Sequence, residues 1–320
     1  MAAPGDCRVL VLHDRPEDFR DALATRFPDL TIDYATGGEA VPAALERLRP
    51  QVVFSIKQPS FPPPGHRPAV DFPTVEWFQV GGSGYEHIQP WDRERLTVTN
   101  CAGVLAPFQA ETVMAAILML NGGFLRYLDQ QRRAEWRQHF FRPLAGQTLA
   151  VVGLGQIGGR VAAHAKALGM RVLGLRRSAT PHPSVDALYP PEALHRVLAE
   201  ADVVSLHLRL DETTRHTIDR EALAAMKPGA VLINTARGPV VDETAVIAAL
   251  EEGHLGGAYL DVFETEPLPA ESPLWGLKNV ILTPHVADAV PDWTARFADF
   301  FADNLERWLA GEPLQNLVEG

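Results

Sequence analysis

The 320-residue chain has few cysteines, no long apolar run and no excess of basic residues. Cys7 and Cys101 are its only cysteines and show no C-x-x-C spacing, so it has no framework for a disulfide-stapled secreted fold. The longest apolar run, residues 113–120, is too short to span a bilayer, and no signal-like segment begins the chain. We therefore expect a cytoplasmic protein with two unpaired thiols.

The charge balance is acidic, with 29 Lys and Arg against 40 Asp and Glu, a net charge of −11. Such a surface repels nucleic acid and anionic membranes, so neither is expected as a partner. A small anionic substrate must instead be attracted by a few placed cations. The 11 histidines show no H-E-x-x-H or other metal-ligand spacing, and no metal is expected.

Short apolar segments alternate with helical ones along most of the chain, which is typical of α/β folds. Strands are expected at residues 8–13, 30–34, 52–56, 75–80 and 96–99, and helices at residues 18–27 and 40–48. A proline-rich loop over residues 58–68 and a long helix beginning near residue 108 follow from the same patterns. A final helix over residues 292–309 is expected to pack back on the first domain.

From residue 148 the alternation becomes regular. Six strands are expected, with the sequences TLAVV, RVLGL, DVVSL, AVLIN, GAYLD and VILT. Near-continuous apolar strands of this length belong to a parallel sheet covered on both faces, and six of them match a doubly wound dinucleotide fold. The predicted fold class is therefore α/β, with two Rossmann-like, doubly wound parallel-sheet domains and a cleft between them.

A glycine-rich turn follows the strand TLAVV. The strand leads directly into G-x-G-x-x-G, and a helix with an apolar stripe comes next. The first glycine makes a tight turn, the second lets the backbone approach a pyrophosphate, and the third packs the helix on the strand. The N–H groups at the helix N-terminus then bind phosphate. The predicted dinucleotide site includes Gly153, Gly155, Gln156, Ile157 and Gly158.

The end of the next strand, RVLGL, bears on the choice of coenzyme. An acidic residue at this point would hold the ribose 2′-hydroxyl of NAD, but Arg176, Arg177 and Ser178 stand there. Two guanidinium groups and a hydroxyl bind a 2′-phosphate through charge-assisted hydrogen bonds. NADP(H) is therefore favoured, with NAD(H) as the alternative. A pair of solvated arginines at a strand end is the purely structural interpretation.

Three polar residues follow strands in the second half of this sheet, where open α/β sheets bind ligands. Arg237 follows AVLIN, Glu266 follows GAYLD and His285 follows VILT. An arginine orients a carboxylate and polarises a ketone, and a histidine donates a proton as hydride reaches the carbon. A carboxylate holds the imidazole and favours its protonated form. The three residues are predicted to be catalytic, with Arg237 and His285 also binding the substrate.

The segments that carry these residues, NTARGPVVDE, DVFETEP and TPH, resemble those of the D-isomer-specific 2-hydroxyacid dehydrogenase family, which includes glyoxylate/hydroxypyruvate reductases. The resemblance spans nearly the whole chain. It implies reduction of a 2-keto acid to the D-2-hydroxy acid by hydride transfer from NAD(P)H. In the family pattern the carboxylate before the proline is the acid partner, so the role falls to Glu266 and not to Glu264.

The same resemblance implies roles for other positions. Asp261 matches the residue that holds the nicotinamide carboxamide, and the turn Gly82-Ser83-Gly84 matches the loop that receives the substrate carboxylate. The positions that match the coenzyme lining are Thr235, Ala236 and His207, although Arg209 stands where the family usually has proline. Lys57, at the end of a predicted strand, would contact a second anionic or hydroxyl group of the substrate, or would be an exposed lysine without a role.

By analogy with the family, residues 1–100 plus 287–320 form a discontinuous, flavodoxin-like substrate-binding domain, and residues 101–286 form the dinucleotide-binding Rossmann domain. Residues 136–141 match a dimer arm, so a homodimer is expected, although a surface hairpin fits the segment equally well. Two other functions stay open. Formate-oxidising relatives carry glutamine where Glu266 stands, and some relatives bind dinucleotide and act mainly as transcriptional corepressors.

Overall fold

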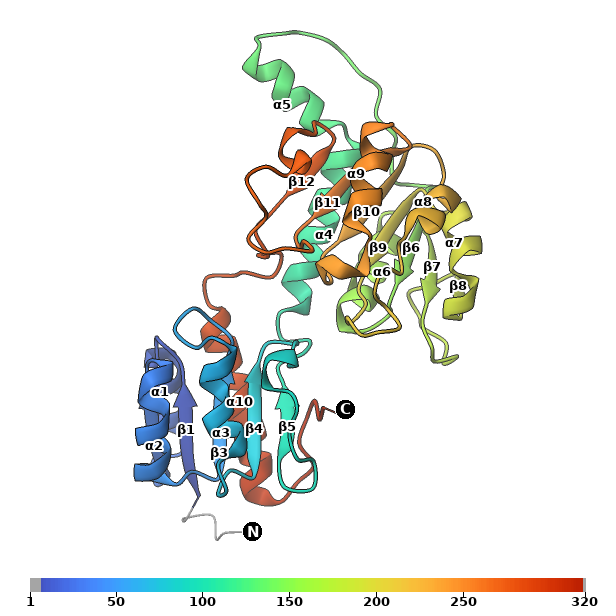
Figure 1. Cartoon of the computed structure of the whole chain (residues 1–320). Coiled ribbons are helices and arrows are strands. Elements are labelled where there is room, and N and C mark those ends of the chain that lie inside the picture. The colour runs from blue at the N-terminus through green and yellow to red at the C-terminus, as the bar shows by residue number, and fades with distance from the viewer. Residues whose placement is uncertain (1–6, 319–320) are drawn as a thin grey trace. The chain divides into compact units, whose positions relative to one another are not determined.

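A computed structural model describes residues 7–318 of the chain. Two compact units are present. One comprises Met1–Leu105 and Val290–Gly320, and the other comprises Ala106–Ala289. Residues 1–6 and 319–320 of the predicted first domain lie outside the described residues. Both units contain a wholly parallel sheet, which confirms the predicted α/β class (Figure 1).

The first unit has a five-stranded sheet in the order β2-β1-β3-β4-β5, all parallel. Its strands are β1 (Arg8–Leu12), β2 (Thr31–Ala35), β3 (Val52–Ile56), β4 (Trp77–Gly81) and β5 (Thr97–Asn100). This 2-1-3-4-5 order is that of flavodoxin-like sheets. The order brings the carboxyl ends of β3 and β4 side by side at one edge.

Helices cover both faces of this sheet because successive strand residues point to opposite sides. The helices are α1 (Glu17–Arg26), α2 (Val41–Leu48), α3 (Arg67–Asp71) and α10 (Trp293–Ala310). On one face, the ring of Phe301 in α10 lies 5.3 Å from Phe54 and 5.5 Å from Trp77, between centroids. On the other face, Val53 packs with Leu45 of α2. The last helix of the chain therefore packs on a sheet built from the first hundred residues.

The second unit has a seven-stranded parallel sheet in the order β12-β11-β10-β9-β6-β7-β8. Its strands are β6 (Thr148–Val152), β7 (Arg171–Leu175), β8 (Ala187–Tyr189), β9 (Val203–Leu206), β10 (Ala230–Asn234), β11 (Leu255–Leu260) and β12 (Val280–Leu282). The order reverses at β6, as in doubly wound dinucleotide folds. The prediction of six strands was wrong by one: β8 has only three half-buried residues at the sheet edge and gives no periodic signal.

Two helical layers enclose this second sheet. Val152 and Leu232 belong to the core under α7 (Leu194–Glu200), α8 (Arg220–Ala225) and α9 (Glu243–Glu251). Their neighbours Val151 and Ile233 point the opposite way, toward α4 (Ala106–Asn121) and α6 (Gln156–Ala167). The near-continuous apolar strands therefore have a partner layer on each face.

Two segments differ from expectation. Beyond Gly122 and Gly123, which end α4, lies a helix that was not predicted, α5 (Phe124–Arg132). The proline-rich segment expected as a loop contains a 3₁₀ turn and the start of α3.

Within residues 7–318 no single helix meets the length and hydropathy needed to cross a membrane. Helices α4 and α5 meet the test only when taken together, across a 66° bend. The short 3₁₀ helices are η2 (Gly38–Ala40), η3 (Pro63–His66), η4 (Glu86–Ile88), η5 (Pro191–Ala193), η6 (Gly238–Val240) and η7 (Pro273–Gly276).

Candidate active site

The glycine turn between β6 and α6 has the geometry of a dinucleotide cradle. Gly153 has φ +100°, and a Cβ there would lie 2.5 Å from the carbonyl oxygen of His207. A Cβ at Gly158 would lie 2.0 Å from the carbonyl oxygen of Gly153, so only glycine lets α6 approach the turn. At Gly155 a Cβ would meet nothing within 4 Å, so this face of the backbone is open. The turn therefore fits a pyrophosphate held at the N-terminus of α6.

A groove of about 460 Å³ lies over this turn. Its lining residues are Leu154, Gly155, Gln156, Gly159, Arg160 and His182. The Nδ1 atom of His182 accepts the N–H of Ser184 at 3.3 Å, so a neutral ring carries its proton on Nε2. A Cβ at Gly159 would lie 2.9 Å from that Nε2, which places the imidazole beside the first turn of α6. The sequence pattern did not single out Arg160 or His182, because neither belongs to the glycine motif.

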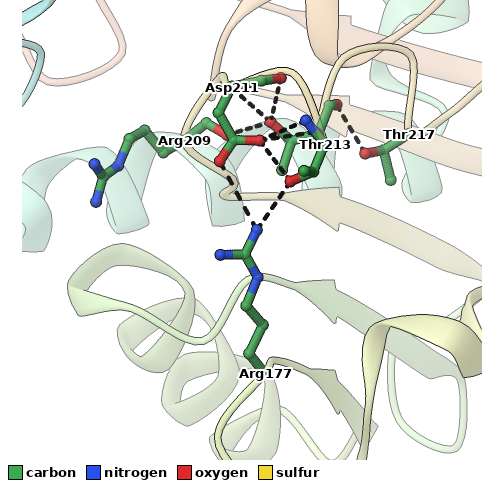
Figure 2. A network of polar contacts seen from close by, with 6 residues as sticks. Arg177, Arg209, Asp211, Thr213 and Thr217 are labelled. Atoms are coloured by element: carbon green, nitrogen blue, oxygen red, sulfur yellow. Dashed lines mark hydrogen bonds and ion pairs between the residues drawn. The ribbon is translucent and has the colours of Figure 1, made fainter. Parts of the chain in front are cut away.

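The three residues after β7 point in different directions. Arg176 folds back on its own loop, donating to the carbonyl oxygens of Ser178 and Thr180. The hydroxyl of Ser178 lies 2.9 Å from that of Thr180. Arg177 instead extends to the loop after β9, where it donates to the Thr213 hydroxyl at 2.9 Å (Figure 2). Arg176 thus braces the loop, and Arg177 presents its guanidinium outward.

The side chain of His207 lies inside the unit rather than in the groove. Its Nε2 is 2.9 Å from the hydroxyl of Ser205, and its Nδ1 is enclosed without a hydrogen-bond partner among the described residues. Burial lowers the pKa of this imidazole to about 3. The backbone of His207 packs against Gly153, so the residue contributes to the turn through its main chain.

The residues after β10 form a hydrogen-bonded turn that carries Arg237. The Asn234 amide accepts from the N–H of Ala236 at 3.1 Å and donates to the carbonyl oxygen of Arg237 at 3.1 Å. Gln109 of α4, buried and not predicted from the sequence, donates to the carbonyl oxygen of Thr235 at 2.6 Å. The Arg237 guanidinium donates to the carbonyl oxygen of Ala236 at 2.8 Å. The turn is therefore fixed from both sides, while most donors of the guanidinium fork remain for a ligand.

Glu266 and His285 form the expected pair. The Oε2 atom of Glu266 lies 2.9 Å from Nδ1 of His285, and its Oε1 accepts the N–H of Phe263 at 3.1 Å. The His285 side chain is 50% exposed, so the pair is accessible to a ligand. With Nδ1 directed at the carboxylate, Nε2 is the ring atom left to exchange a proton.

Asp261 anchors the loop that carries His285. Its Oδ1 accepts from the Thr283 hydroxyl at 2.5 Å and from the N–H of Val286 at 2.8 Å, and its Oδ2 accepts from the N–H of Ala287 at 3.1 Å. The Tyr259 hydroxyl lies 2.9 Å from the Thr283 hydroxyl and extends the network into the core. The Asp261 carboxylate therefore positions the His285 loop, a role that the sequence did not indicate.

The Asp288 carboxyl interacts electrostatically with Asp261, His285 and Arg237. Burial raises the pKa of its carboxyl, Asp261 raises it further, and the charges of His285 and Arg237 lower it. The topology agrees, because β10, β11 and β12 are neighbours whose carboxyl ends meet at one edge. Arg237, Glu266 and His285 therefore follow three neighbouring strands, although they lie far apart in the sequence.

The predicted substrate residues of the first unit share an edge of its own sheet. Lys57 follows β3 and is exposed, and Gly82 follows β4 with φ +107°. Asn100 donates to the carbonyl oxygen of Ser83 at 2.9 Å, which fixes the turn before Gly84. These residues lie in a different unit from Arg237, and their contacts with a substrate stay predictions.

Neither a metal cluster nor a disulfide is formed by the residues that the structure describes. No group of three or more His, Cys, Asp or Glu among them has a metal-binding arrangement. Cys7 and Cys101 are both buried and free, and burial raises the pKa of their thiols, to about 11 and about 12.

The second unit combines a doubly wound sheet, a glycine turn before α6 and an Arg–Glu–His group at the carboxyl edge of the same sheet. Together these features define a nicotinamide-dependent oxidoreductase. The family model for the D-isomer specific 2-hydroxyacid dehydrogenase, NAD binding domain, matches residues 114–287. The chain belongs to this family of NAD(P)-dependent 2-hydroxyacid dehydrogenases and 2-keto acid reductases.

Two curated relatives show the range of activities among similar proteins. The chain is 38% identical over 246 residues to a glyoxylate reductase of Korarchaeum cryptofilum, with 73% of each protein covered. It is 44% identical over 206 residues to an (S)-sulfolactate dehydrogenase of Chromohalobacter salexigens, which covers 62% of this chain and 66% of the relative. The family is thus shared, but the named substrates differ.

Solved structures match over nearly the full length. A family member from Aeromonas salmonicida aligns with a TM-score of 0.86 and 32% identity, covering 98% of this chain and 99% of the other. The NADPH-dependent glyoxylate/hydroxypyruvate reductase of Sinorhizobium meliloti, solved with NADP and sulfate, aligns with a TM-score of 0.82 and 28% identity, covering 98% of each chain. The two-sheet architecture is therefore that of the family.

Proposed function

We propose that this protein reduces a small 2-keto acid of the glyoxylate or hydroxypyruvate type to the D-2-hydroxy acid, with NADPH preferred over NADH. The observation that carries the proposal is the Glu266–His285 pair, 2.9 Å apart. Glu266 follows β11 and His285 follows β12, the two strands next in order to β10, which carries Arg237. The names of the glyoxylate reductase relatives support the substrate class.

The roles of the three residues follow from their chemistry. The Arg237 guanidinium binds the substrate carboxylate and polarises the keto group through its planar fork of donors. The Nε2 atom of His285 delivers the proton to the keto oxygen, and Glu266 stabilises the imidazolium through Nδ1. The nicotinamide coenzyme, when bound, supplies the hydride. Reversal of the same proton transfer serves oxidation of the hydroxy acid.

The residues that would hold the coenzyme lie along the carboxyl edge of the second sheet. The pyrophosphate is assigned to the turn from Gly153 to Gly158, whose open face at Gly155 suits close approach of phosphate. Arg177 is assigned to the 2′-phosphate, because its guanidinium extends outward whereas Arg176 is bound to loop carbonyls. The NADP found with the Sinorhizobium meliloti reductase supports this preference.

A second candidate substrate is suggested by the sulfolactate dehydrogenase relative. Its substrate adds a sulfonate to the 2-hydroxy acid group. Lys57, exposed at the end of β3, would be the cation for such a second anionic group. The headgroup chemistry of Arg237 and His285 is the same for both substrates, so the side chain of the substrate is the point to test.

The decisive experiment assays the purified chain with glyoxylate, hydroxypyruvate, phenylpyruvate and 3-sulfopyruvate, each with NADPH and with NADH at neutral pH. We expect the highest kcat/KM for one of the two smallest keto acids with NADPH. Equal kcat/KM with both coenzymes would end the NADPH assignment. Tight coenzyme binding without turnover of any keto acid would favour a corepressor-like protein. A parallel assay of formate with NADP⁺ and with NAD⁺ tests the formate-type alternative, which oxidation of formate would favour.

A further inference from the structure

The Arg177 side chain connects two loops that flank the glycine turn. It follows β7, and its guanidinium donates to the Thr213 hydroxyl at 2.9 Å and lies 3.8 Å from Oδ2 of Asp211, both in the loop after β9 (Figure 2). The arginine side chain is 75% exposed, so the contact lies on the surface of the unit. An exposed ion pair of this kind adds little stability by itself. Its position relative to the coenzyme site, however, bears on coenzyme binding.

The position follows from the sheet order. In the series β9-β6-β7, the strand that ends in the glycine turn lies between the two strands whose loops Arg177 joins. Dinucleotides bind in the crevice beyond these carboxyl ends, with the adenosine ribose at the end of the strand that corresponds to β7. The contact of Arg177 with the loop after β9 therefore lies where the 2′-substituent of the ribose is bound. Arg177 is on the β7 side of this position and Asp211 is on the β9 side.

The Asp211 carboxylate is held in place by its own loop. Its Oδ1 accepts three hydrogen bonds, from the Thr213 hydroxyl at 2.6 Å and from the N–H groups of Thr213 and Thr214 at 2.8 Å and 3.0 Å. These bonds, the hydroxyl bond first, lower the pKa of the carboxyl, so it is ionised at neutral pH. Its Oδ2 is directed at Arg177. The three bonds to its own loop hold the Asp211 carboxylate in place independently of the position of the Arg177 side chain.

We propose that Asp211 is a coenzyme-specificity residue that opposes the 2′-phosphate and favours the 2′-hydroxyl, and so limits the preference for NADP(H) that Arg177 provides. The proposal rests on the proposed function, since it assumes that Arg177 binds the 2′-phosphate. A phosphate monoester carries nearly two negative charges at neutral pH, and a fixed carboxylate repels it. A ribose 2′-hydroxyl, in contrast, can donate a hydrogen bond to Oδ2. The acidic residue missing from the end of β7 is thus supplied by the loop after β9.

The test measures the Kd of NADP⁺ and of NAD⁺ by isothermal titration calorimetry, without turnover. The main variant is Asp211→Asn, which retains an oxygen to accept the loop N–H groups. We expect its Kd for NADP⁺ to fall about 3- to 10-fold at moderate salt, as for one unit charge removed a few ångströms from a phosphate. The Kd for NAD⁺ is expected to stay the same or to rise. An unchanged or higher Kd for NADP⁺ overturns the proposal.

Two further variants separate the charge of Asp211 from other effects. Glu212→Gln removes one negative charge from the same exposed loop and should change the ratio of the two Kd values by less than about twofold, because screening weakens distant charges. Thr213→Val removes the acceptor for Arg177 and one of the three hydrogen bonds to Asp211, but leaves the carboxylate and its two N–H donors, from Thr213 and Thr214. The ratio of the two Kd values should stay within about twofold in this variant, since the charge that repels the phosphate persists. If either variant binds NADP⁺ as much more tightly than the wild type as Asp211→Asn does, the assignment to Asp211 is overturned.

The proposed function is tested separately by Arg177→Ala. If Arg177 binds the 2′-phosphate, this variant raises the Kd for NADP⁺ by about tenfold or more and leaves that for NAD⁺ nearly unchanged. If Arg177→Ala changes neither Kd, the NADPH assignment fails, whatever Asp211→Asn does. If Arg177→Ala behaves as expected and Asp211→Asn does not, only the inference about Asp211 fails.

Discussion

His285 has a backbone conformation that few residues other than glycine adopt, with φ +56°. The surrounding structure holds it there: its N–H donates to the carbonyl oxygens of Asp261 at 2.8 Å and Thr283 at 3.1 Å. The conformation directs Nδ1 at Glu266. A constrained residue of this kind is typical of functional sites, where precise orientation offsets a cost of about 1–3 kcal/mol.

We predict that His285→Ala lowers kcat by about 10²- to 10⁴-fold, because a positioned acid/base group contributes that much. Steady-state kinetics with the best keto acid of the panel would measure it. The chain offers a matched control in His216→Ala, since His216 and Glu264 form a similar half-exposed pair at 3.0 Å. Near-normal turnover in His285→Ala, or an equal loss in the control, contradicts the assignment.

Arg237→Ala is expected to raise KM and to lower kcat, because the guanidinium binds both the ground state and the transition state. A charge-assisted contact of this kind corresponds to a loss of about 10- to 100-fold in kcat/KM. The exposed Arg215 gives the comparison variant, Arg215→Ala, with the same change of net charge. If the two variants have the same kinetics, Arg237 does not bind the substrate carboxylate.

At the scale of elements, the contact of α6 with the turn after β6 depends on one missing side chain. A Cβ at Gly158 would lie 2.0 Å from a backbone oxygen, which cannot move without shifting the helix or the strand end. The N-terminus of α6 would then lose its place beside the groove. Helix position and phosphate binding are therefore coupled through this residue.

Gly158→Ala is accordingly predicted to destabilise the chain by about 1–3 kcal/mol, the usual cost of overpacking, and to weaken binding of NADP⁺. Thermal unfolding and calorimetry would measure the two effects. Gly276→Ala is the control, because a Cβ at that glycine meets nothing within 4 Å. A fully stable Gly158→Ala variant with unchanged affinity would show that the glycine is not required for this packing.

At the scale of the whole molecule, acid stability is set partly by neutral histidines that are largely shielded from solvent. Burial lowers the pKa of His207 to about 3 and is the largest cause of the shift of His87 to about 4. In an unfolded chain both would titrate near pH 6.5. Below that pH the unfolded state binds protons that the folded state does not. The free energy of unfolding therefore falls as the pH decreases from about 6.5 toward 4, by about 1.4 kcal/mol per pH unit for each histidine.

Urea unfolding at pH 7.5 and pH 5.0 would test this dependence. His207→Gln is expected to reduce the loss of stability between the two pH values, whatever its effect at pH 7.5, because one titrating group is removed. His195→Gln, at an exposed position on α7, should keep the loss of the wild type. An identical pH dependence in wild type and His207→Gln would show that His207 does not titrate as described.

The segment from α5 to residue 141 exposes several large apolar side chains. Trp136 is 94% exposed, Phe140 and Phe141 are 106% and 63% exposed, and Phe124 is 55% exposed. Figure 1 shows α5 and the loop that follows it, residues 133–147, extending beyond the sheet of their own unit. Exposed apolar patches of this kind mark protein contacts. We expect a second copy of the chain to cover them in a homodimer.

Light scattering after size exclusion is expected to give the mass of a dimer for the wild type. Trp136→Ser combined with Phe140→Ser should shift the chain toward monomer, because the patch loses its two most exposed aromatic side chains. Leu168→Ser changes a 42% exposed residue directly after α6 and is the control, which should remain dimeric. A monomeric wild type contradicts the dimer.

Local features of this protein could be predicted from its sequence because they depend on neighbouring residues. Apolar strands and a helical stripe indicate parallel sheets, and the contact that requires glycine at position 158, with the carbonyl oxygen of Gly153, lies within one turn. The family resemblance indicated Glu266, and not Glu264, as the partner of His285, and the two side chains pair at 2.9 Å. Edge elements such as β8 and α5 were missed because they are short or continue an existing helix.

The tertiary structure decided which side chains meet across loops. Whether Arg177 faces Asp211 or solvent, and whether His182 lies over Gly159, depends on loop conformations that no local pattern specifies. The same holds for Asp261, which Thr283, Val286 and Ala287 engage from the next strand end. Backbone sterics and hydrophobic periodicity act over a few residues and can be read along the chain. Partners separated by dozens of residues are chosen only when the packed sheet brings its strand ends to one edge.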